Sequence, residues 1–290
     1  MPEKTYDVAV LGCGLMGSAI ARAFASNGHK VAAWNRTPER ARALTGAGIT
    51  AVDSVAEAVA DSRFVLACTA TYDTTRAALA EVTDWSETPL ANVASGGPDE
   101  VAAFAQWAAD RGIAYLDGAI ICFPRQIGTE EGIVLYSGDP GVWSAHGSVL
   151  KALGEMSDLI GTETHAASVV DAAIVGAFYT SAVSAYVEGA TFALGLGISV
   201  DTMRGITELA VGSVGVAMAE ALEAIDSGEF ATDQATVSVY AEGCRTLLAG
   251  IRAAGFRARQ LGATVDGLDA AEAAGLGDLG LYALSKVAAT

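Results

Sequence analysis

Three glycines near the amino terminus have the spacing that binds the pyrophosphate of a dinucleotide. Gly12, Gly14 and Gly17 form a G-x-G-x-x-G pattern, preceded by an apolar run at 7–11 and followed by helix-forming residues from position 18. In this order the first glycine permits a tight turn, the second lets the pyrophosphate approach the backbone, and the third lets helix and strand pack closely. The free N–H groups of the helix N-terminus then face the phosphates. The pattern therefore predicts a dinucleotide-binding turn.

The end of the next predicted strand indicates which dinucleotide is bound. Residues 30–34 form this strand, and Asn35, Arg36 and Thr37 follow it. A chain built for NAD usually carries an acid here, which binds the ribose 2′-hydroxyl. Arg36 can instead hold a 2′-phosphate through paired, charge-assisted hydrogen bonds, with Asn35 and Thr37 as further donors. This arrangement favours NADPH over NADH, although Arg36 could also be an ordinary exposed loop residue.

A carboxylate interrupts the most apolar stretch of the chain, residues 165–199. The stretch contains no proline and has no polar stripe at helical spacing, so it predicts a helix that is buried on all sides. Its length of about 45 Å exceeds what one small domain covers. Asp171 lies near its start, and burying a carboxylate without a partner is costly. Either Asp171 is a helix-start acid that favours the helix dipole, or it has a functional role; its own position leaves both open.

The elements that must position these residues alternate between strand and helix up to residue 163. Such alternation predicts a parallel sheet with helices on both faces. Thr69 follows the predicted strand 63–68 and Ser95 follows the strand 90–94, so both belong to the carboxyl edge, where ligands bind in such sheets. Asp117 is expected in a loop after the strand 113–116, and 132–138 is the last clear strand.

The fold class predicted is α/β with an all-α carboxyl-terminal part. We expect an NADP-binding Rossmann domain at 1–163, a long interdomain helix at 164–199 and a helical substrate and dimerisation domain at 200–290. Within the last domain the pattern predicts helices over 201–225, 232–258 and 269–287. Asp201 and Thr232 are the expected N-caps of the first two.

Charge and cysteine usage limit the partners. Acids outnumber bases 34 to 17, giving a formal net charge of −17, which argues against nucleic acid and against an anionic membrane surface. The 4 cysteines have no metal-ligand spacing and the 3 histidines form no cluster, so no metal is expected. Free thiols and the lack of a recognisable signal peptide predict a cytoplasmic protein. The 165–199 stretch is long enough to span a membrane, but its two acids make that reading improbable.

Several longer segments resemble one enzyme family along nearly the whole chain. They are GLMG, WNRTPERA, ANVASGGP, DGAIICFPRQIGTEEGIVLYSG and VVDAAIVGAFY. The chain resembles the NADPH-dependent imine reductases and reductive aminases, relatives of the 3-hydroxyacid dehydrogenases and of 6-phosphogluconate dehydrogenase. The resemblance implies a Rossmann domain, a long interdomain helix and a helical domain. It also implies an interlocked homodimer, with each active site between the Rossmann domain of one chain and the helical domain of the other.

The resemblance also implies roles for residues of the substrate site. Asp171 takes the position of the proton donor or of the anchor for the substrate nitrogen, and Tyr179 that of a second active-site residue. In an α-helix these two lie roughly 12 Å apart along the axis and about 80° apart around it. Ser95 falls near the nicotinamide, while Ala210 and Tyr240 line the substrate pocket. Some relatives carry a large aromatic residue where Ala210 stands, so a roomier pocket is expected.

The cofactor contacts expected for NADPH lie in the glycine turn, after the second strand and in two loops. They are Gly12, Gly14, Leu15, Met16, Gly17, Asn35, Arg36, Thr37, Thr69 and Ser95.

Lysine usage separates two related activities. The hydroxyacid dehydrogenases use a lysine of the long helix as general acid, and this chain has no lysine between Lys151 and Lys286. A carboxyl group in its place suits a cationic substrate such as an iminium. The sequence therefore predicts an NADPH-dependent reductase of the C=N bonds of cyclic imines and iminium ions, with reductive amination of ketones as an extension.

Two alternatives remain: an NADP-dependent 3-hydroxyacid or carbonyl dehydrogenase, and a catalytically inactive NADPH-binding sensor. A third pattern, Tyr282-x-x-x-Lys286, matches the short-chain dehydrogenases. It lies at the end of the chain, and the glycine turn is of a different type, so we expect it to be structural.

Overall fold

The computed structural model describes residues 4–85 and 87–289 and divides into two compact units. The first is Met1–Ala177 and the second is Phe178–Thr290. The division falls inside the long apolar helix and not at either of its ends. The predicted α/β class is confirmed, because the first unit is a layered sheet with helices and the second is entirely helical.

The first unit is built on one sheet, for which the described residues supply eight strands in the order β3-β2-β1-β4-β5-β6-β7-β8. The strands are β1 (Val8–Leu11), β2 (Val31–Trp34), β3 (Ile49–Ala51), β4 (Val65–Ala67), β5 (Leu90–Asn92), β6 (Tyr115–Ile120), β7 (Val134–Gly138) and β8 (Asp158–Gly161). Neighbouring strands are parallel except for β6 and β7, which are antiparallel. The predicted parallel sheet is thus confirmed except at this one antiparallel pair. The connection from β6 to β7 carries no crossover helix, which leaves an antiparallel return as the available pairing.

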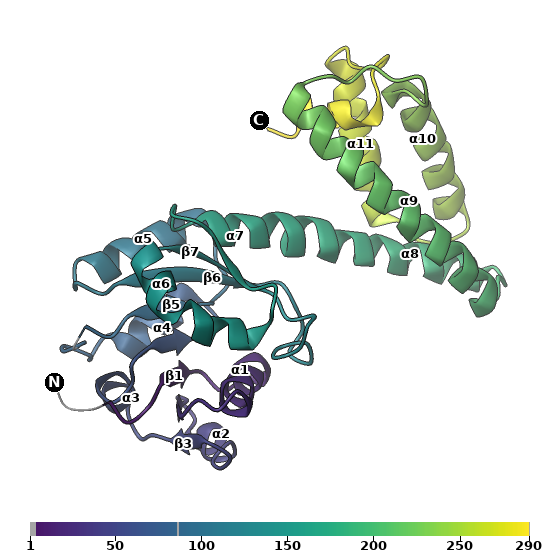
Figure 1. Cartoon of the computed structure of the whole chain (residues 1–290). Coiled ribbons are helices and arrows are strands. Elements are labelled where there is room, and N and C mark those ends of the chain that lie inside the picture. Colours follow the sequence, from purple (N-terminus) through teal and green to yellow (C-terminus); the bar gives the residue numbers. More distant parts are fainter. Residues whose placement is uncertain (1–3, 86, 290) are drawn as a thin grey trace. The chain divides into compact units, whose positions relative to one another are not determined.

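Helices cover both faces of this sheet (Figure 1). They are α1 (Leu15–Ser26), α2 (Pro38–Arg42), α3 (Val55–Ala60), α4 (Tyr72–Leu79), α5 (Pro98–Ala109), α6 (Pro140–Leu150) with the 3₁₀ turn η1 (Lys151–Leu153), and α7 (Ala166–Asp171). One apolar core includes Phe24 of α1 and Leu150 of α6, and the other includes Leu79 of α4 and Phe104 of α5. Strands covered on both faces must be apolar throughout, and all four residues of β1 are indeed buried.

The long apolar helix is not uniformly α-helical. After α7 it continues as a π-helix, η2 (Ala172–Thr180), and then as α8 (Ser181–Gly195). π-helical stretches are rare and frequently mark functional sites. The spacing between Asp171 and Tyr179 calculated above for an α-helix therefore does not apply, because all the intervening residues are π-helical.

The burial expected for this helix is not provided by its own chain. No residue of η2 or α8 is buried, and Val183 and Tyr186 are among its large exposed apolar side chains. The runs Ala166–Gly195 and Val200–Ser227 are both long and apolar enough to cross a membrane, judged by length and composition alone. Apolar faces of this extent need a covering surface.

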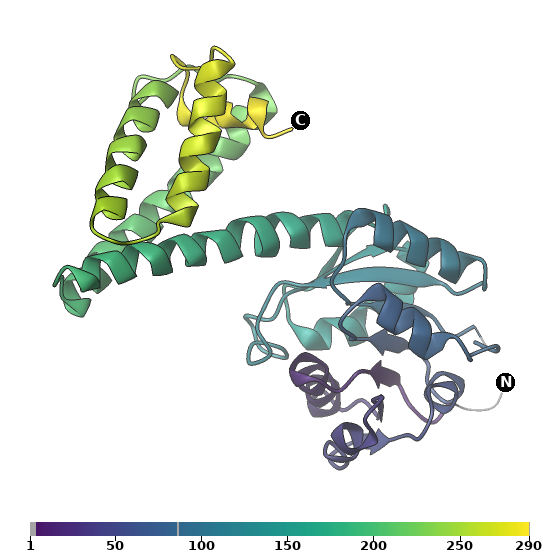
Figure 2. The same cartoon turned by 180° about the vertical axis from the view of Figure 1, so that it is seen from behind.

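The second unit continues with α9 (Val200–Ser227), α10 (Val237–Ala253), α11 (Arg259–Ala273) and the 3₁₀ helix η3 (Leu281–Val287). Helices α10 and α11 lie side by side (Figure 2). A small core there includes Phe230, Val237 and Leu268. Glu188 of α8 has a structural role, because its Oε2 accepts from the backbone N–H of Gln260, 3.0 Å away, in the first turn of α11.

Three expectations for this unit were wrong. Ser199 and Thr236 cap α9 and α10 in place of Asp201 and Thr232. Asp201 instead pairs with Arg204 on the helix surface at 2.7 Å. The helix expected over 269–287 is split, because the chain leaves α11 at Ala273 and turns through several irregular residues before η3.

Candidate functional site

The glycine turn between β1 and α1 is held by close backbone contacts. Gly12 has φ +103°, and a Cβ there would lie 2.3 Å from the Cys68 carbonyl oxygen after β4. A Cβ on Gly17 would lie 1.8 Å from the Gly12 carbonyl oxygen. No atom lies within 4 Å of a Cβ built on Gly14. Of these three glycines, Gly14 is therefore the one whose backbone borders open space. α1 has no side-chain cap, which leaves its first N–H groups available to a phosphate. The turn therefore fits a dinucleotide pyrophosphate.

The two other predicted contacts of α1 differ in exposure. Leu15, in the first turn, is 87% exposed, whereas Met16 packs partly against the core.

The glycine turn lies where the sheet order changes direction, with β2 on one side of β1 and β4 on the other. This is the switch point at which open α/β sheets bind their ligands. Burial raises the pKa of the nearby Cys13 and Cys68 thiols to about 11 and about 12, so neither is a thiolate nucleophile at neutral pH.

The residues after β2 have different tasks. Asn35 Oδ1 accepts from the backbone N–H of Cys13 at 2.8 Å, and its Nδ2 donates to the Thr37 carbonyl at 2.9 Å. The Asn35 amide therefore ties this loop to the glycine turn and uses one of its two N–H donors, and the other N–H remains for the predicted phosphate contact. Thr37 is exposed and its side chain does not cap α2. Arg36 is exposed and has no ion pair with any residue that the structure describes, so its guanidinium is free to bind an anion.

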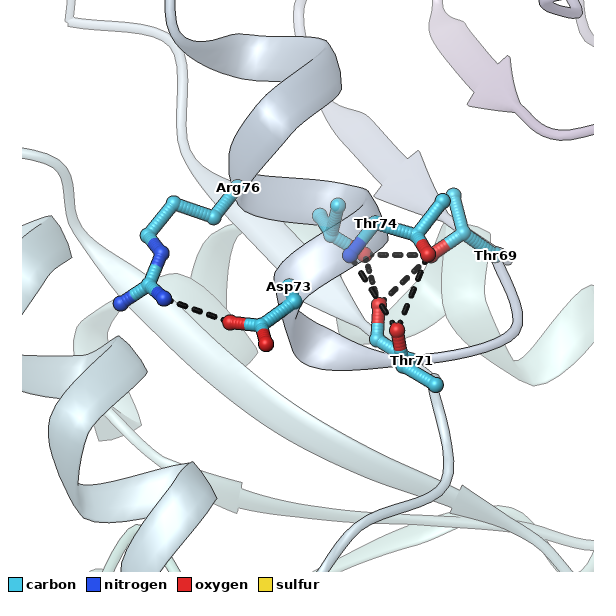
Figure 3. Close-up of polar contacts among 6 residues, drawn as sticks. Thr69, Thr71, Asp73, Thr74 and Arg76 are labelled. Carbon is cyan, nitrogen blue, oxygen red and sulfur yellow. Dashed lines mark hydrogen bonds and ion pairs between the residues drawn. The ribbon is translucent and has the colours of Figure 1, made fainter.

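A threonine network fixes the loop after β4. Thr69 is hydrogen-bonded through its hydroxyl to the Thr75 hydroxyl at 2.6 Å. Thr71 caps α4 by accepting from the backbone N–H of Thr74 at 3.2 Å (Figure 3). Thr75 in turn donates to Asn92 of β5 at 3.1 Å. The loop that carries Thr69 is thereby anchored to the neighbouring strand.

The loop after β5 packs on an aromatic ring. A Cβ on Gly96 would lie 2.6 Å from two ring carbons of Tyr72, so only glycine lets the backbone approach this closely. The Gly97 N–H donates to Glu100 Oε2 at 2.9 Å, which closes the first turn of α5. Ser95 is exposed at this edge, and its hydroxyl has no hydrogen-bond partner among the described residues.

Asp171 ends α7 and is half-buried. Burial raises the pKa of its carboxyl, as expected for a carboxyl in an apolar setting. It forms no ion pair with the described cationic side chains, so its charge is not neutralised within the part of the chain that the structure covers. Ser137 of β7 anchors the start of α7: its Oγ donates to the Thr164 carbonyl at 2.7 Å and accepts from the Ala167 N–H at 3.0 Å.

The sequence reasoning missed a second buried carboxyl. Asp117 was expected in a loop, but it lies within β6 and is fully buried. The Tyr72 and Tyr115 hydroxyls both donate to its Oδ1, at 2.7 Å and 2.9 Å. Desolvation raises the pKa of Asp117 to about 7, and the Asp171 charge adds to the rise. An acid is disfavoured in strands, so the local pattern ended the strand early; only the distant Tyr72 hydroxyl could have signalled this position.

The remaining predicted residues belong to the second unit. Tyr179 lies in η2 and is half exposed, Ala210 lies on α9 and Tyr240 on α10, and the last two are exposed.

The Tyr282 hydroxyl donates to Glu220 Oε2 at 2.8 Å, and Lys286 Nζ lies 5.0 Å above the ring of Phe230. The two side chains are therefore each engaged within the helical unit. No group of three metal-ligating side chains occurs in residues 4–85 and 87–289.

The fold and this site define a dinucleotide-binding α/β protein with an acid-bearing helix beside its sheet. Residues 7–162 match the NAD binding domain of 6-phosphogluconate dehydrogenase. The chain belongs to this family. A curated relative, an NADPH-dependent reductive aminase from Aspergillus oryzae, is 29% identical over 175 residues. That alignment covers 59% of this chain and 59% of the relative.

Two solved structures are similar over nearly the full length. An imine reductase from Pseudomonas sp. has a TM-score of 0.91 and 29% identity, with 97% of this chain and 98% of that chain covered. An imine reductase from Myxococcus stipitatus, solved in complex with NADP+, has a TM-score of 0.90 and 26% identity, with 97% and 99% covered.

Proposed function

We propose that this chain is an NADPH-dependent imine reductase that also carries out reductive amination of ketones. The observation that carries the proposal is the half-buried Asp171 carboxyl on a lysine-free helix, in a chain similar over 97% of its length to the Pseudomonas imine reductase. A lysine acid suits a carbonyl that develops an alkoxide, whereas a carboxyl suits a substrate nitrogen that carries positive charge.

The residues of the Rossmann unit bind and orient the cofactor. The open backbone at Gly14 and the uncapped N-terminus of α1 receive the pyrophosphate, and Arg36 pairs with the 2′-phosphate. Bound NADPH supplies the hydride that adds to the carbon of the C=N bond. Thr69 and Ser95 border the carboxyl edge of the sheet, where we place the nicotinamide and its substrate.

Asp171 manages the charge and the proton at the substrate nitrogen. As a carboxylate it pairs with the iminium; as a carboxylic acid it donates the proton that the nitrogen gains. Both roles benefit from the partial burial of Asp171, because low solvent exposure strengthens its interaction with the cation. Tyr179 is proposed as the second polar group of the site, and Ala210 and Tyr240 as lining residues that leave room for a larger substrate.

We further propose that two chains form a homodimer with shared active sites. The exposed apolar faces of α8 and α9 support this proposal, since a second copy of the same surfaces would cover them. The described cysteines are free, which is compatible with the proposed cytoplasmic location.

Three separate assays test the activity. Two follow NADPH oxidation, one with a small cyclic imine and one with a ketone plus an amine. The third follows NADP+ reduction with a 3-hydroxyacid. The proposal expects turnover with the first two. Turnover with the hydroxyacid alone would replace it by the dehydrogenase activity, and NADPH binding without any turnover would indicate a sensor.

A further inference from the structure

The buried carboxyl of Asp117 has an unusual set of hydrogen bonds. Both tyrosine hydroxyls donate to the same oxygen, Oδ1, while Oδ2 is buried and has no hydrogen-bond partner among the described residues. An ionised carboxylate with one bare buried oxygen is costly. A carboxyl that only stabilised the fold would be expected to use both oxygens.

Asp117 is part of a polar row that crosses three strands beneath α7. In the strand register Asp117 pairs with Asn92 of β5 and with Ser137 of β7, and all three are buried. Side chains at paired positions of neighbouring strands point to the same face of a sheet. Ser137 holds the first turn of α7, and α7 packs on β6. Asp117 therefore lies under the helix whose last residue is Asp171.

Tyr72 connects the same carboxyl to the Ser95 loop. Its hydroxyl donates to Asp117, while its ring touches the backbone of Gly96. The groups that face Asp117 come from every element around it. They are Tyr72 of α4 and Tyr115 of β6, both donating hydroxyls, and the Asp171 carboxyl of α7; Glu100 of α5 acts on Tyr72. Every charged group in this set is an acid, so the pair of carboxyls has no cation to share.

We propose that Asp117 is a positioning residue for the imine reduction proposed above: its buried carboxyl, held by Tyr72 and Tyr115 beneath α7, is electrostatically coupled to Asp171 and, while protonated, keeps a second negative charge away from the Asp171 carboxylate. Two carboxyls in mutual range resist ionising together. With Asp171 ionised, Asp117 keeps its proton to higher pH. When an iminium neutralises the Asp171 charge, Asp117 can ionise more easily. The protonation of Asp117 is thereby linked to the charge of Asp171.

The first test follows the protonated Asp117 carboxyl directly, through its infrared C=O absorption in the full-length protein as pH is raised. We expect a band that titrates near pH 7 and is absent in Asp117→Asn. In Asp171→Asn the band should titrate at lower pH, because the charge of Asp171 no longer opposes ionisation. In Tyr72→Phe it should titrate at higher pH, because a hydrogen bond to the carboxylate is lost. A band that titrates at the same pH in Asp171→Asn as in the wild type would overturn the coupling.

The second test uses the pH profile of imine reduction. The wild-type kcat/KM should show an ionisation near pH 7 that disappears in Asp117→Asn and moves upward in Tyr72→Phe, with NADPH affinity unchanged in both. If Asp117 were purely structural, Asp117→Asn would lower the free energy of unfolding but leave the pH profile of kcat/KM unchanged. That result would overturn the proposal. If the wild type reduces no imine, the proposed function fails, whereas the infrared titration still decides whether the two carboxyls are coupled.

Discussion

The two units of this chain use apolar residues in opposite ways. In the Rossmann unit the central strands β1 and β4 are apolar and covered on both faces, with Val10 and Leu66 fully inaccessible. In the helical unit α9 is rich in valine, leucine and isoleucine, yet none of its residues is buried. The first unit covers its own apolar surface, whereas the second presents it. The exposed apolar surface of the second unit is what the proposed dimer would cover.

The largest effect is expected when a charge is placed on an exposed apolar residue of each unit in turn. Leu222 on α9 is 72% exposed and Met156 of the Rossmann unit is 54% exposed. Leu222→Asp should convert a dimer to monomers or to aggregates, because in a symmetric interface the uncompensated carboxylate is buried twice. Met156→Asp, the matched control, should leave the mass unchanged.

Light scattering at micromolar concentration measures the mass of both variants and of the wild type. Wild-type protein should have twice the chain mass of 29.4 kDa. A monomeric wild type that binds substrate normally would show that the apolar faces of the helical unit serve another purpose.

The next largest effect concerns the buried Asp117 carboxyl of the Rossmann core. Burial raises the pKa of Asp117 from 3.8 to about 7. Between these two pH values the unfolded chain releases the proton and the folded chain keeps it. The contribution of this group to the free energy of unfolding is therefore fully present below pH 4 and is lost as the pH rises to about 7. At about 1.36 kcal/mol per pH unit, the loss is on the order of 4 kcal/mol.

Urea unfolding from pH 4.5 to 8 tests this sign. Asp117→Asn should flatten the decline in the free energy of unfolding, because its amide oxygen still accepts from both tyrosines and carries no charge. Asp278→Asn, at an exposed aspartate of the helical unit, should retain the wild-type slope. An equal slope in all three proteins would show that Asp117 ionises in the folded state much as it does when unfolded.

A smaller effect is expected at Asp171, which lies in the Rossmann unit at the start of the long helix. Asp171→Asn keeps the size of the side chain but removes its charge and acidity. We expect turnover on imines to fall by ~10²-fold, as is typical for the loss of a general acid, with NADPH binding little changed. Glu188→Gln is the matched control, since it removes the other charge of the helix yet keeps an oxygen for the Gln260 N–H. Full turnover in Asp171→Asn would leave Asp171 a helix-start acid and make Tyr179→Phe the next variant to assay.

Features that depend on local chemistry could be predicted from the sequence, whereas features that depend on contacts from distant residues could not. The glycine turn and the switch point depend on local chemistry, since Gly12 and Gly17 each satisfy a contact that a Cβ would block. Asp117 depends on a hydroxyl from 45 residues away, which no local pattern reveals. β8 is a half-exposed strand without the apolar run that marks the others. The π-helical stretch of η2 cannot be distinguished from an α-helix by apolar composition alone.

The smallest expected effect tests whether the Rossmann unit selects its cofactor with one side chain. Arg36 is exposed and unpaired within the described part of the chain, and Asn35 next to it also ties the loop to the glycine turn. Arg36 is the only cation among the three residues predicted to hold the phosphate, so it carries the charge-assisted part of the contact. Losing one charge-assisted hydrogen-bonded contact costs roughly 1.5–3 kcal/mol, so Arg36→Ala should raise the KM for NADPH about tenfold or more and leave the KM for NADH nearly unchanged. Arg42→Ala is the control, because Arg42 already pairs with Glu39 and Asp53 on the surface and should not affect either constant. Initial rates with both cofactors at saturating imine measure the two ratios. Equal rates with NADPH and NADH in the wild type would show that the loop after β2 does not read the 2′-phosphate, and the selectivity would then have to come from residues outside it.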